Sequence, residues 1–405
     1  MAKPLRVLFV GYGQHGTTFL SRLAKGLAAS GIQVTLATFS KNSPRWLAEY
    51  GVQRLWTPPW DGLILLRLLR LGNMLITRFS LARLSWLWRQ IRTGSTLGDQ
   101  LRRLNRYLPF LRGDWDVIYF SWNSAAIDYR GLYELGIPVV VSCRGSQLNI
   151  RPHMPAQEVY TEALQASLNN ATTVHCVSAD IQQSVLGLGV DSQKCTVIRP
   201  AVDPERFSPP EIRPHSMRFT LITTGSLIWS KDYESMLIAL KLLVDAGVDA
   251  ELHIIGEGPE RQHITFTIHD LGLVDCVVLH GRQSPDEVRD QLRSADVFVL
   301  SSLSEGIANA VLEGMSCGLP VVTTDCGGMR EAVTDGEEGF VIPVRDPQSM
   351  AAALEILAHD PDLRRRMGQA GRARVIKDFH MQDHVDAFIS LFESTAADKP
   401  ERNAG

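Results

Sequence analysis

Several features are missing from this chain of 405 residues, and each absence removes a class of protein. Its six cysteines form no Cys-x-x-Cys pair and no cluster with histidine, which argues against a zinc site or a disulfide framework. No uncharged apolar run reaches about 18 residues, so no membrane-spanning helix is expected. The net charge of −3 argues against a nucleic-acid-binding protein. The first residues run directly into a strand without a signal peptide, and a reduced, cytoplasmic protein is expected.

Strand-like and helical segments do alternate along the chain, and the alternation restarts once. The first half contains the runs RVLFV, VTLATF, VIYFSW and PVVVSC, separated by helical segments. After a proline-rich polar stretch at 204–216, strand-like runs resume, with helices expected at 232–246, 259–271, 285–294 and 307–317. Such an order is typical of parallel α/β units.

The sequence therefore predicts an α/β protein with two tandem Rossmann-like domains whose parallel sheets face a central cleft. The expected domains are residues 1–207 and 208–378, and a ligand should bind between them, beyond the carboxyl ends of the strands. The remainder, 379–405, contains a last helix at about 381–395 that could cross back to the first domain.

Two glutamates mark the stretch SEGIANAVLEGMSCGLPVV, residues 304–322. Glu305 follows the buried strand DVFVLSS, and a helix is expected to begin near Ile307, so free backbone amides and the positive end of the helix dipole favour an anion there. Glu313 lies at most about 12 Å further along the helix axis. Two carboxylates around an anion site suit a nucleotide sugar, although dipole complementation by Glu305 and a surface charge at Glu313 explain the spacing equally well.

The same stretch resembles the Glu-x7-Glu signature of retaining glycosyltransferases of the GT-B fold, family 4. Other segments match that family's pattern in the same order: IRPAVDPERFSP, TTGSLIWSKDYESMLIALKLL, IIGEGPE, LHGRQSPDEV and GLPVVTTDCGGMREAVTDGEEGFVIPVRD. The resemblance covers most of the chain. It implies a hexosyltransferase that uses a nucleotide-diphosphate sugar and a glycan or lipid-linked acceptor, in envelope polysaccharide or glycolipid synthesis. A sugar-nucleotide epimerase and a non-catalytic nucleotide-binding protein of the same fold remain alternatives.

The resemblance also implies roles for single residues. Glu305 would hold the donor hexose and Glu313 the ribose, while Lys231 would neutralise the diphosphate of the leaving group. The remaining donor-binding positions would surround Glu305 at the start of the helix, namely Gly306, Ile307, Ala308 and Asn309.

The chain departs from the family pattern at the turn 199–201, which reads Arg-Pro-Ala instead of Pro-Asn-Gly, and at two positions that bear on the site. Ser226 stands where the family usually has an arginine that binds the donor phosphates, so one cation is missing. Arg144 stands at a strand end where many members have histidine, and from there it could reach the phosphates, the sugar or the acceptor. The gain of charge at 144 and its loss at 226 could be linked.

Two short motifs suggest other chemistry. GYGQHG at 11–16 matches Gly-x-Gly-x-x-Gly, but a dinucleotide site needs an acid at the end of the second strand, and none is there. Gly13 and Gly16 are therefore expected to face the donor diphosphate, and His15 the acceptor or a local cap. DWD at 114–116 is read as a polar lead into its strand, so neither a catalytic metal nor another cofactor is expected.

Residues 61–113 contain ten arginines and only two aspartates. On a helical projection, Arg67, Arg70, Arg78, Arg89 and Arg92 share one side, Arg83 does not, and leucines and Trp86 occupy much of the rest. A basic stripe beside such residues is typical of a helix lying on anionic lipid. An ordinary helix pair with a solvated arginine face fits the pattern equally well.

Overall fold

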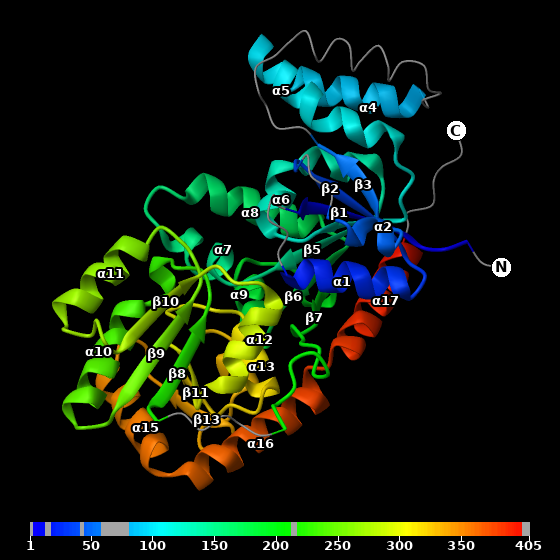
Figure 1. Cartoon of the computed structure of the whole chain (residues 1–405). Helices are drawn as coiled ribbons and strands as arrows, with labels where there is room; N and C mark the ends of the chain where they lie inside the picture. Colours follow the sequence, from blue (N-terminus) through cyan, green and yellow to red (C-terminus); the bar gives the residue numbers. More distant parts are fainter. Residues whose placement is uncertain (1–2, 13–17, 41–43, 58–80, 212–216, 399–405) are drawn as a thin grey trace.

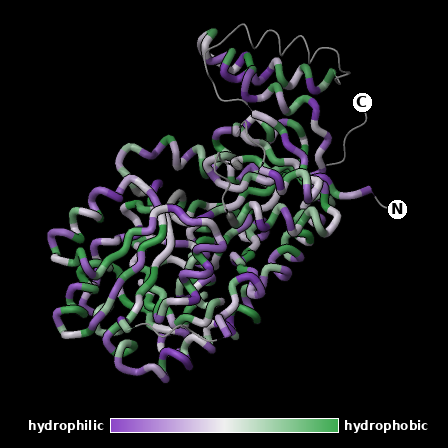
Figure 2. Tube along the Cα trace, in the orientation of Figure 1, coloured by the Kyte–Doolittle hydropathy of each residue, from purple (hydrophilic) through white to green (hydrophobic). Residues whose placement is uncertain are grey.

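The computed structural model describes two lobes, each built on a parallel sheet with helices on both faces (Figure 1). Hydrophobic residues concentrate along the strands of both sheets (Figure 2). The predicted fold class, two Rossmann-like parallel-sheet domains, is therefore confirmed. The described residues are 3–12, 18–40, 44–57, 81–211 and 217–398, without the side chains of Tyr12, Thr18, Ser146, Gln147 and His153.

The first lobe contains a seven-stranded sheet in the order β3-β2-β1-β4-β5-β6-β7. Successive side chains of β1 pack into two different cores, since Leu8 and Val10 lie on one face of the sheet and Val7 and Phe9 on the other. The strands are β1 (Arg6–Tyr12), β2 (Gln33–Thr38), β3 (Gln53–Trp56), β4 (Val117–Phe120), β5 (Val139–Cys143), β6 (Thr173–Cys176) and β7 (Cys195–Val197).

The second lobe contains a six-stranded sheet in the order β10-β9-β8-β11-β12-β13. Its central strands are apolar on both sides, as expected for a parallel sheet covered on both faces. The strands are β8 (Phe219–Thr224), β9 (Ala250–Ile255), β10 (Val277–Gly281), β11 (Val297–Leu300), β12 (Val321–Thr324) and β13 (Gly339–Ile342).

Helices connect these strands in both lobes. Those of the first lobe are α1 (Thr18–Ala29), α2 (Trp46–Glu49), α4 (Leu81–Arg92), α5 (Leu97–Tyr107), α6 (Asn123–Asp128), α7 (Ser146–Asn149), α8 (Glu158–Asn170) and α9 (Ala179–Gly187). Those of the second are α10 (Tyr233–Asp245), α11 (Arg261–Asp270), α12 (Pro285–Ser294), α13 (Asn309–Ser316), α14 (Met329–Ala332), α15 (Pro347–His359) and α16 (Pro361–Asp378), followed by α17 (Met381–Ala397).

The helix expected from Ile307 begins two residues later, at Asn309. Ala308 has an extended backbone, with φ −77° and ψ 116°, so the chain from Gly306 to Ala308 is not helical. Gly306 packs tightly against the first lobe, where a Cβ on it would lie 2.5 Å from Val177 Cγ2. The tight contact between lobes therefore accompanies the late start of α13.

The last helix, α17, packs against the first lobe although it follows the second in sequence (Figure 1). Phe388 is fully buried there, with its ring centroid 5.7 Å from that of Tyr119 and 5.6 Å from that of Phe392. Val202, at the end of the first lobe, forms a parallel bridge with His380. The second lobe is thus tied to the first at two places in the chain, near Val202 and through α17.

The arginine-rich insert is described only from Leu81 onward, and Arg67, Arg70 and Arg78 lie outside the described residues. Helices α4 and α5 lie at the end of the first lobe farthest from the second lobe (Figure 1). Trp86 faces the core, where its indole donates to the Gly131 carbonyl at 2.9 Å, whereas Trp88 is exposed. In the described ranges no helix is long and apolar enough to cross a bilayer.

Replacing Phe388 tests how strongly α17 holds the first lobe. Phe388→Ala should lower the free energy of unfolding by about 3–5 kcal/mol, because it leaves a cavity among aromatic rings. Urea denaturation followed by tryptophan fluorescence measures this loss. Phe266→Ala, at a side chain that is 68% exposed in α11, is the matched control and should change little. Equal stability of the two variants would contradict the packing role of α17.

Candidate active site

The carboxyl ends of β8 and β11 bring Lys231 and Glu305 together. Lys231 Nζ lies 2.5 Å from Glu305 Oε1, and each side chain is less than one-fifth exposed. Ser302 Oγ donates to the same carboxylate oxygen at 2.8 Å. Ser301 Oγ donates to the Lys231 carbonyl at 2.8 Å, which fixes the short turn that carries the lysine. Two side chains, those of Lys231 and Ser302, thus hold the Glu305 carboxylate.

A cavity of about 210 Å³ opens in front of this pair, between the lobes. We call it the Glu305 cavity. The first lobe contributes aromatic and cationic side chains, and the second contributes the loop before α13. Its lining residues are Phe19, Trp122, Arg144, Gly145, Val177, Pro200, Ile228, Ser230, Lys231, Ser304, Glu305, Gly306, Ile307 and Asn309. The first turn of α13 has no side-chain cap, so its free amides add positive potential beside the cavity.

Arg144 is a cation of the first lobe in the wall of the Glu305 cavity. Its guanidinium lies 4.0 Å from the centroid of the Phe19 ring, and one nitrogen donates to the Tyr119 hydroxyl at 3.4 Å. Within the described ranges no carboxylate pairs with Arg144, and its buried Nε has no hydrogen-bond partner. Its charge is therefore available to an anion in the cavity.

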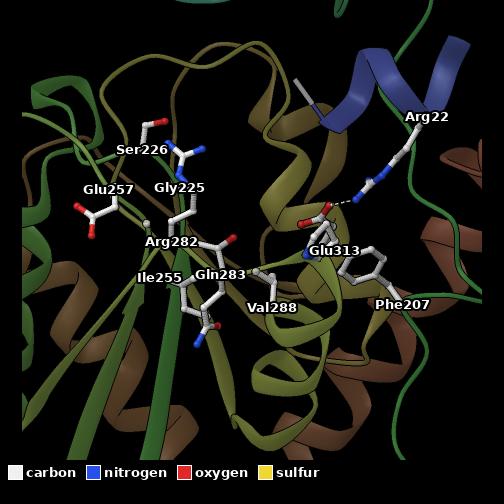
Figure 3. A pocket seen from close by; sticks show the side chains of 13 residues that line it. Arg22, Phe207, Gly225, Ser226, Ile255, Glu257, Arg282, Gln283, Val288 and Glu313 are labelled. Atoms are coloured by element: carbon white, nitrogen blue, oxygen red, sulfur yellow. Dashed lines mark hydrogen bonds and ion pairs between the residues drawn. The ribbon is translucent and has the colours of Figure 1, made fainter. Parts of the chain in front are cut away.

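A second cavity, of about 270 Å³, adjoins the first, and we call it the Glu313 cavity (Figure 3). It is lined by Arg22, Phe207, Thr224, Gly225, Ser226, Ile255, Gly256, Glu257, Arg282, Gln283, Pro285, Val288 and Glu313. A Cβ placed on Gly225 would lie 3.9 Å from Lys231 Nζ. Lys231, which lines the Glu305 cavity, therefore lies next to Gly225 in the lining of the Glu313 cavity.

Ser226 lies in the Glu313 cavity, at the position where the family pattern has an arginine. In Figure 3 the Arg282 side chain extends toward Ser226 from the loop after β10. Arg282 is exposed, and in the described part of the chain no acidic side chain pairs with it. Arg282 thus supplies positive charge next to the serine.

Arg22, on α1 of the first lobe, pairs with Glu313 on α13 of the second lobe. Arg22 Nη2 donates to Glu313 Oε1 at 2.7 Å, as the dashed line in Figure 3 marks. Each of the predicted glutamates is therefore paired with a cation, and the two cations come from different lobes.

Another link between the lobes involves Glu331 of α14. Its carboxylate accepts from the backbone amides of Ala179 and Asp180, at 2.7 and 3.3 Å, at the start of α9. Arg199 Nε donates to its other oxygen at 2.8 Å. Burial, helped by Glu331, raises the pKa of Asp180. The first turn of α9 thus obtains one acceptor from the opposite lobe, in addition to its own N-cap Ser178, whose Oγ accepts from the Ile181 amide at 3.1 Å.

Two titratable groups near Glu305 are held in their neutral forms. Burial, together with the Glu305 charge, raises the pKa of Tyr233. Burial also raises the pKa of Cys326 to about 12. Neither group is ionised at neutral pH, so neither is a suitable base or nucleophile there.

The structure places most of the predicted site residues in these two cavities. Gly13, His15 and Gly16 lie outside the described residues. Ala308 is buried at the start of α13, next to the residues that line the Glu305 cavity. The remaining predicted residues line one cavity or the other.

The aspartates of the DWD motif lie before β4 and pair with an arginine of β1. Arg6 Nε donates to Asp116 at 3.0 Å and Arg6 Nη1 to Asp114 at 2.5 Å. The ion pairs lower the pKa of Asp114. Across the described ranges, no group of three or more His, Cys, Asp or Glu side chains is arranged to hold a metal.

Four residues of the site were not singled out from the sequence: Arg22, Arg282, Phe19 and Trp122. Arg22 occupies a polar position of an amphipathic helix, where an arginine normally faces water. Arg282 follows the end of β10 in a polar loop, where an arginine is common. Only its position near Ser226 in the folded chain marks it as a site residue. No motif or residue spacing in the sequence marks Phe19 or Trp122 as a site residue.

Two family models match this chain, one in each lobe. The model "Glycosyl transferases group 1" matches residues 205–374, and "Glycosyl transferase 4-like domain" matches residues 16–201. Among curated proteins, the chain is 31% identical over 289 residues to the "Putative colanic acid biosynthesis glycosyltransferase WcaL" of Salmonella typhimurium, covering 69% of this chain and 70% of that protein. It is 29% identical over 285 residues to the "D-inositol 3-phosphate glycosyltransferase" of Paenarthrobacter aurescens, covering 65% and 69%.

Solved structures share the two-lobed fold at low identity. Anabaena HepE in complex with UDP and glucose superposes with a TM-score of 0.73 at 16% identity, over 96% of this chain and 100% of that one. Sucrose-phosphate synthase from Thermosynechococcus elongatus superposes with a TM-score of 0.75 at 18% identity, over 98% and 100%.

Removing the Glu331 carboxylate should loosen the closed arrangement of the lobes. Glu331→Ala deletes an acceptor for two helix amides and one guanidinium, which should favour an open form by about 1–2 kcal/mol. Small-angle X-ray scattering should then give a larger radius of gyration. The control is Glu337→Ala, at an exposed residue nearby. Identical scattering from the two variants would show that Glu331 does not hold the lobes together.

Proposed function

The chain belongs to the group 1 glycosyl transferases, enzymes with the GT-B architecture, and we propose that it transfers a hexose from a nucleotide-diphosphate sugar with retention of configuration. The observation that carries this proposal is the pair of adjoining cavities, one lined by Glu305 and the other by Glu313, with Lys231 between them. The Glu305 cavity accepts the hexose, the Glu313 cavity accepts the nucleoside, and the diphosphate crosses between them.

The charges in the cleft suit a nucleoside diphosphate as the leaving group. Lys231 and the free amides at the start of α13 face it from the second lobe, with Arg282 beside Ser226, and Arg144 faces it from the first. These groups stabilise the negative charge that develops as the bond to the sugar breaks. The closed lobes keep water from the hexose, which limits hydrolysis of the donor.

Transfer proceeds on one face of the sugar. The acceptor hydroxyl oxygen bonds to the anomeric carbon as the bond from that carbon to the phosphate oxygen breaks, and a phosphate oxygen takes the acceptor's proton. No protein nucleophile takes part. Glu305, held by Lys231 and Ser302, accepts hydrogen bonds from hexose hydroxyls and orients the ring.

The acceptor is a glycan or a lipid-linked saccharide that enters from the first lobe. The names of the relatives support a role in polysaccharide synthesis, since the Salmonella relative is described in terms of colanic acid biosynthesis. UDP in the Anabaena structure makes a uridine nucleotide the first donor to try. Exposed Leu81, Leu84 and Trp88 on α4, near Arg92, suit contact with an anionic membrane surface in the cytoplasm.

Substitution of the central ion pair tests the assigned roles. Glu305→Ala and Lys231→Ala should each lower the rate of transfer at least about 100-fold, because each removes a contact to the sugar or the leaving group. Lys241→Ala, on an exposed face of α10, should keep wild-type turnover. Steady-state assays with the identified donor and acceptor measure the rates. Near-normal turnover of both cleft variants would refute the roles.

A panel of nucleotide sugars identifies the donor. UDP-, GDP- and ADP-sugars should be compared by thermal shift, and the correct donor should raise the free energy of unfolding by about 2.7 kcal/mol at 100 times its Kd. Product formation should require a separate acceptor, which distinguishes transfer from epimerisation. Conversion of the donor without an acceptor to another sugar nucleotide would support the epimerase instead.

A further inference from the structure

We propose that Arg22 is a positioning residue that aims the Glu313 carboxylate at the ribose of the donor and makes nucleotide binding depend on closure of the lobes. This inference rests on the proposed function, because it takes the Glu313 cavity as the nucleoside site. It adds a residue of the first lobe to a site otherwise built from the second lobe and the segment that joins the two.

The ion pair is largely removed from water. Its side chains are 13% exposed for Arg22 and 14% for Glu313, and the distance of 2.7 Å is typical of a charge-assisted hydrogen bond. An ion pair on the surface contributes little to stability, whereas breaking a buried ion pair leaves an uncompensated charge in the protein. The pair is therefore strong enough to govern where the Glu313 carboxylate points.

Arg22 is also held from its other side. Its guanidinium lies 5.3 Å from the centroid of the Phe207 ring, which is fully buried in the segment that joins the lobes. The Phe207 carbonyl accepts from Ser316 Oγ at 2.6 Å, at the end of α13, the helix that carries Glu313. Phe207 and Glu313 thus form a socket for the guanidinium in the second lobe.

The backbone of α1, in contrast, is anchored in the first lobe. Leu20, Leu23 and Leu27 are fully buried in the core that also contains Val7 and Phe9 of β1. Arg22 projects from this fixed helix, so its guanidinium reaches the socket only in the closed arrangement. The ion pair is consequently a direct link between lobe position and the state of the nucleoside cavity.

The bound carboxylate still has room for a ribose. A carboxylate offers about four acceptor positions on its two oxygens. Arg22 occupies one position on Oε1, and Oε2 remains for hydroxyl donors in the Glu313 cavity (Figure 3). Arg22 therefore orients Glu313 and keeps its charge compensated without taking the place of the sugar.

The opposite model makes a prediction of opposite sign. If Arg22 were a lock that the nucleotide must break, removing its charge would strengthen nucleotide binding. If Arg22 positions Glu313, removing its charge weakens binding, and the loss requires both Glu313 and the ribose hydroxyls. The direction of the change in affinity therefore separates the two models.

The experiment measures nucleotide affinity by calorimetry for wild type, Arg22→Met, Arg22→Lys and Glu313→Gln. The probes are UDP and its 2′,3′-dideoxy analogue, with GDP and ADP as replacements if UDP does not bind. Arg22→Met should weaken binding of the ribonucleotide about 10- to 100-fold, the value of a hydrogen bond to a charged group. Arg22→Lys should restore part of the loss, and the dideoxy analogue should bind all variants about equally.

A double variant and a kinetic readout complete the test. Adding Arg22→Met to Glu313→Gln should cause little further loss, and the double variant has no unpaired buried charge if the single variant folds poorly. Arg22→Met should raise KM for the donor more than it lowers kcat. Lys25→Met, on the same helix beside Trp46, is the matched control and should bind as wild type does.

Three outcomes would overturn the inference: unchanged affinity in Arg22→Met, tighter binding, or an equal loss for the dideoxy analogue. In each of these the nucleotide still binds to the wild-type enzyme, so the proposed function stands. If no nucleotide or nucleotide sugar binds to the wild-type enzyme, the proposed function itself fails.

Discussion

The placement of two carboxylates in a closed cleft is the constraint on which the rest of the site depends. Glu305 and Glu313 are both largely removed from water, and each is compensated by one cation. Lys231 comes from the same lobe, so its pair is present whether the lobes are open or closed. Arg22 comes from the other lobe, so its pair exists only after closure. The cleft therefore contains one ion pair within a single lobe, Lys231–Glu305, and one between the lobes, Arg22–Glu313, which depends on how the lobes are placed.

The chain achieves closure through contacts that leave little space between the lobes. Gly306 packs against Val177, and the Glu331 carboxylate accepts a hydrogen bond from the Ala179 amide at the start of α9, across the cleft. Helix α17 returns to the first lobe and buries Phe388 there. Gly306 and Val177 also line the Glu305 cavity, so one of the contacts between the lobes forms part of the cavity wall.

The sequence was sufficient for the features that depend on local pattern. Alternating strands and helices predicted both sheets, and α12 has the bounds that the sequence predicted, 285–294. The pair of glutamates could be located from their spacing, and the family resemblance supplied their roles. The start of α13 was predicted two residues too early. The extended chain before it includes Gly306, which packs against Val177 of the other lobe, and a contact between lobes cannot be read from the local sequence pattern. Arg22 was missed for a similar reason, since its partner is 291 residues away.

The most direct test of the account is a crystal structure of the protein with an intact nucleotide-sugar analogue in the cleft. We expect the hexose to lie against Glu305, the ribose hydroxyls against Glu313 with Arg22 still paired to it, and the diphosphate beside Lys231. A sugar nucleotide bound elsewhere, or bound in this cleft with neither glutamate contacting a hydroxyl, would contradict the central claim.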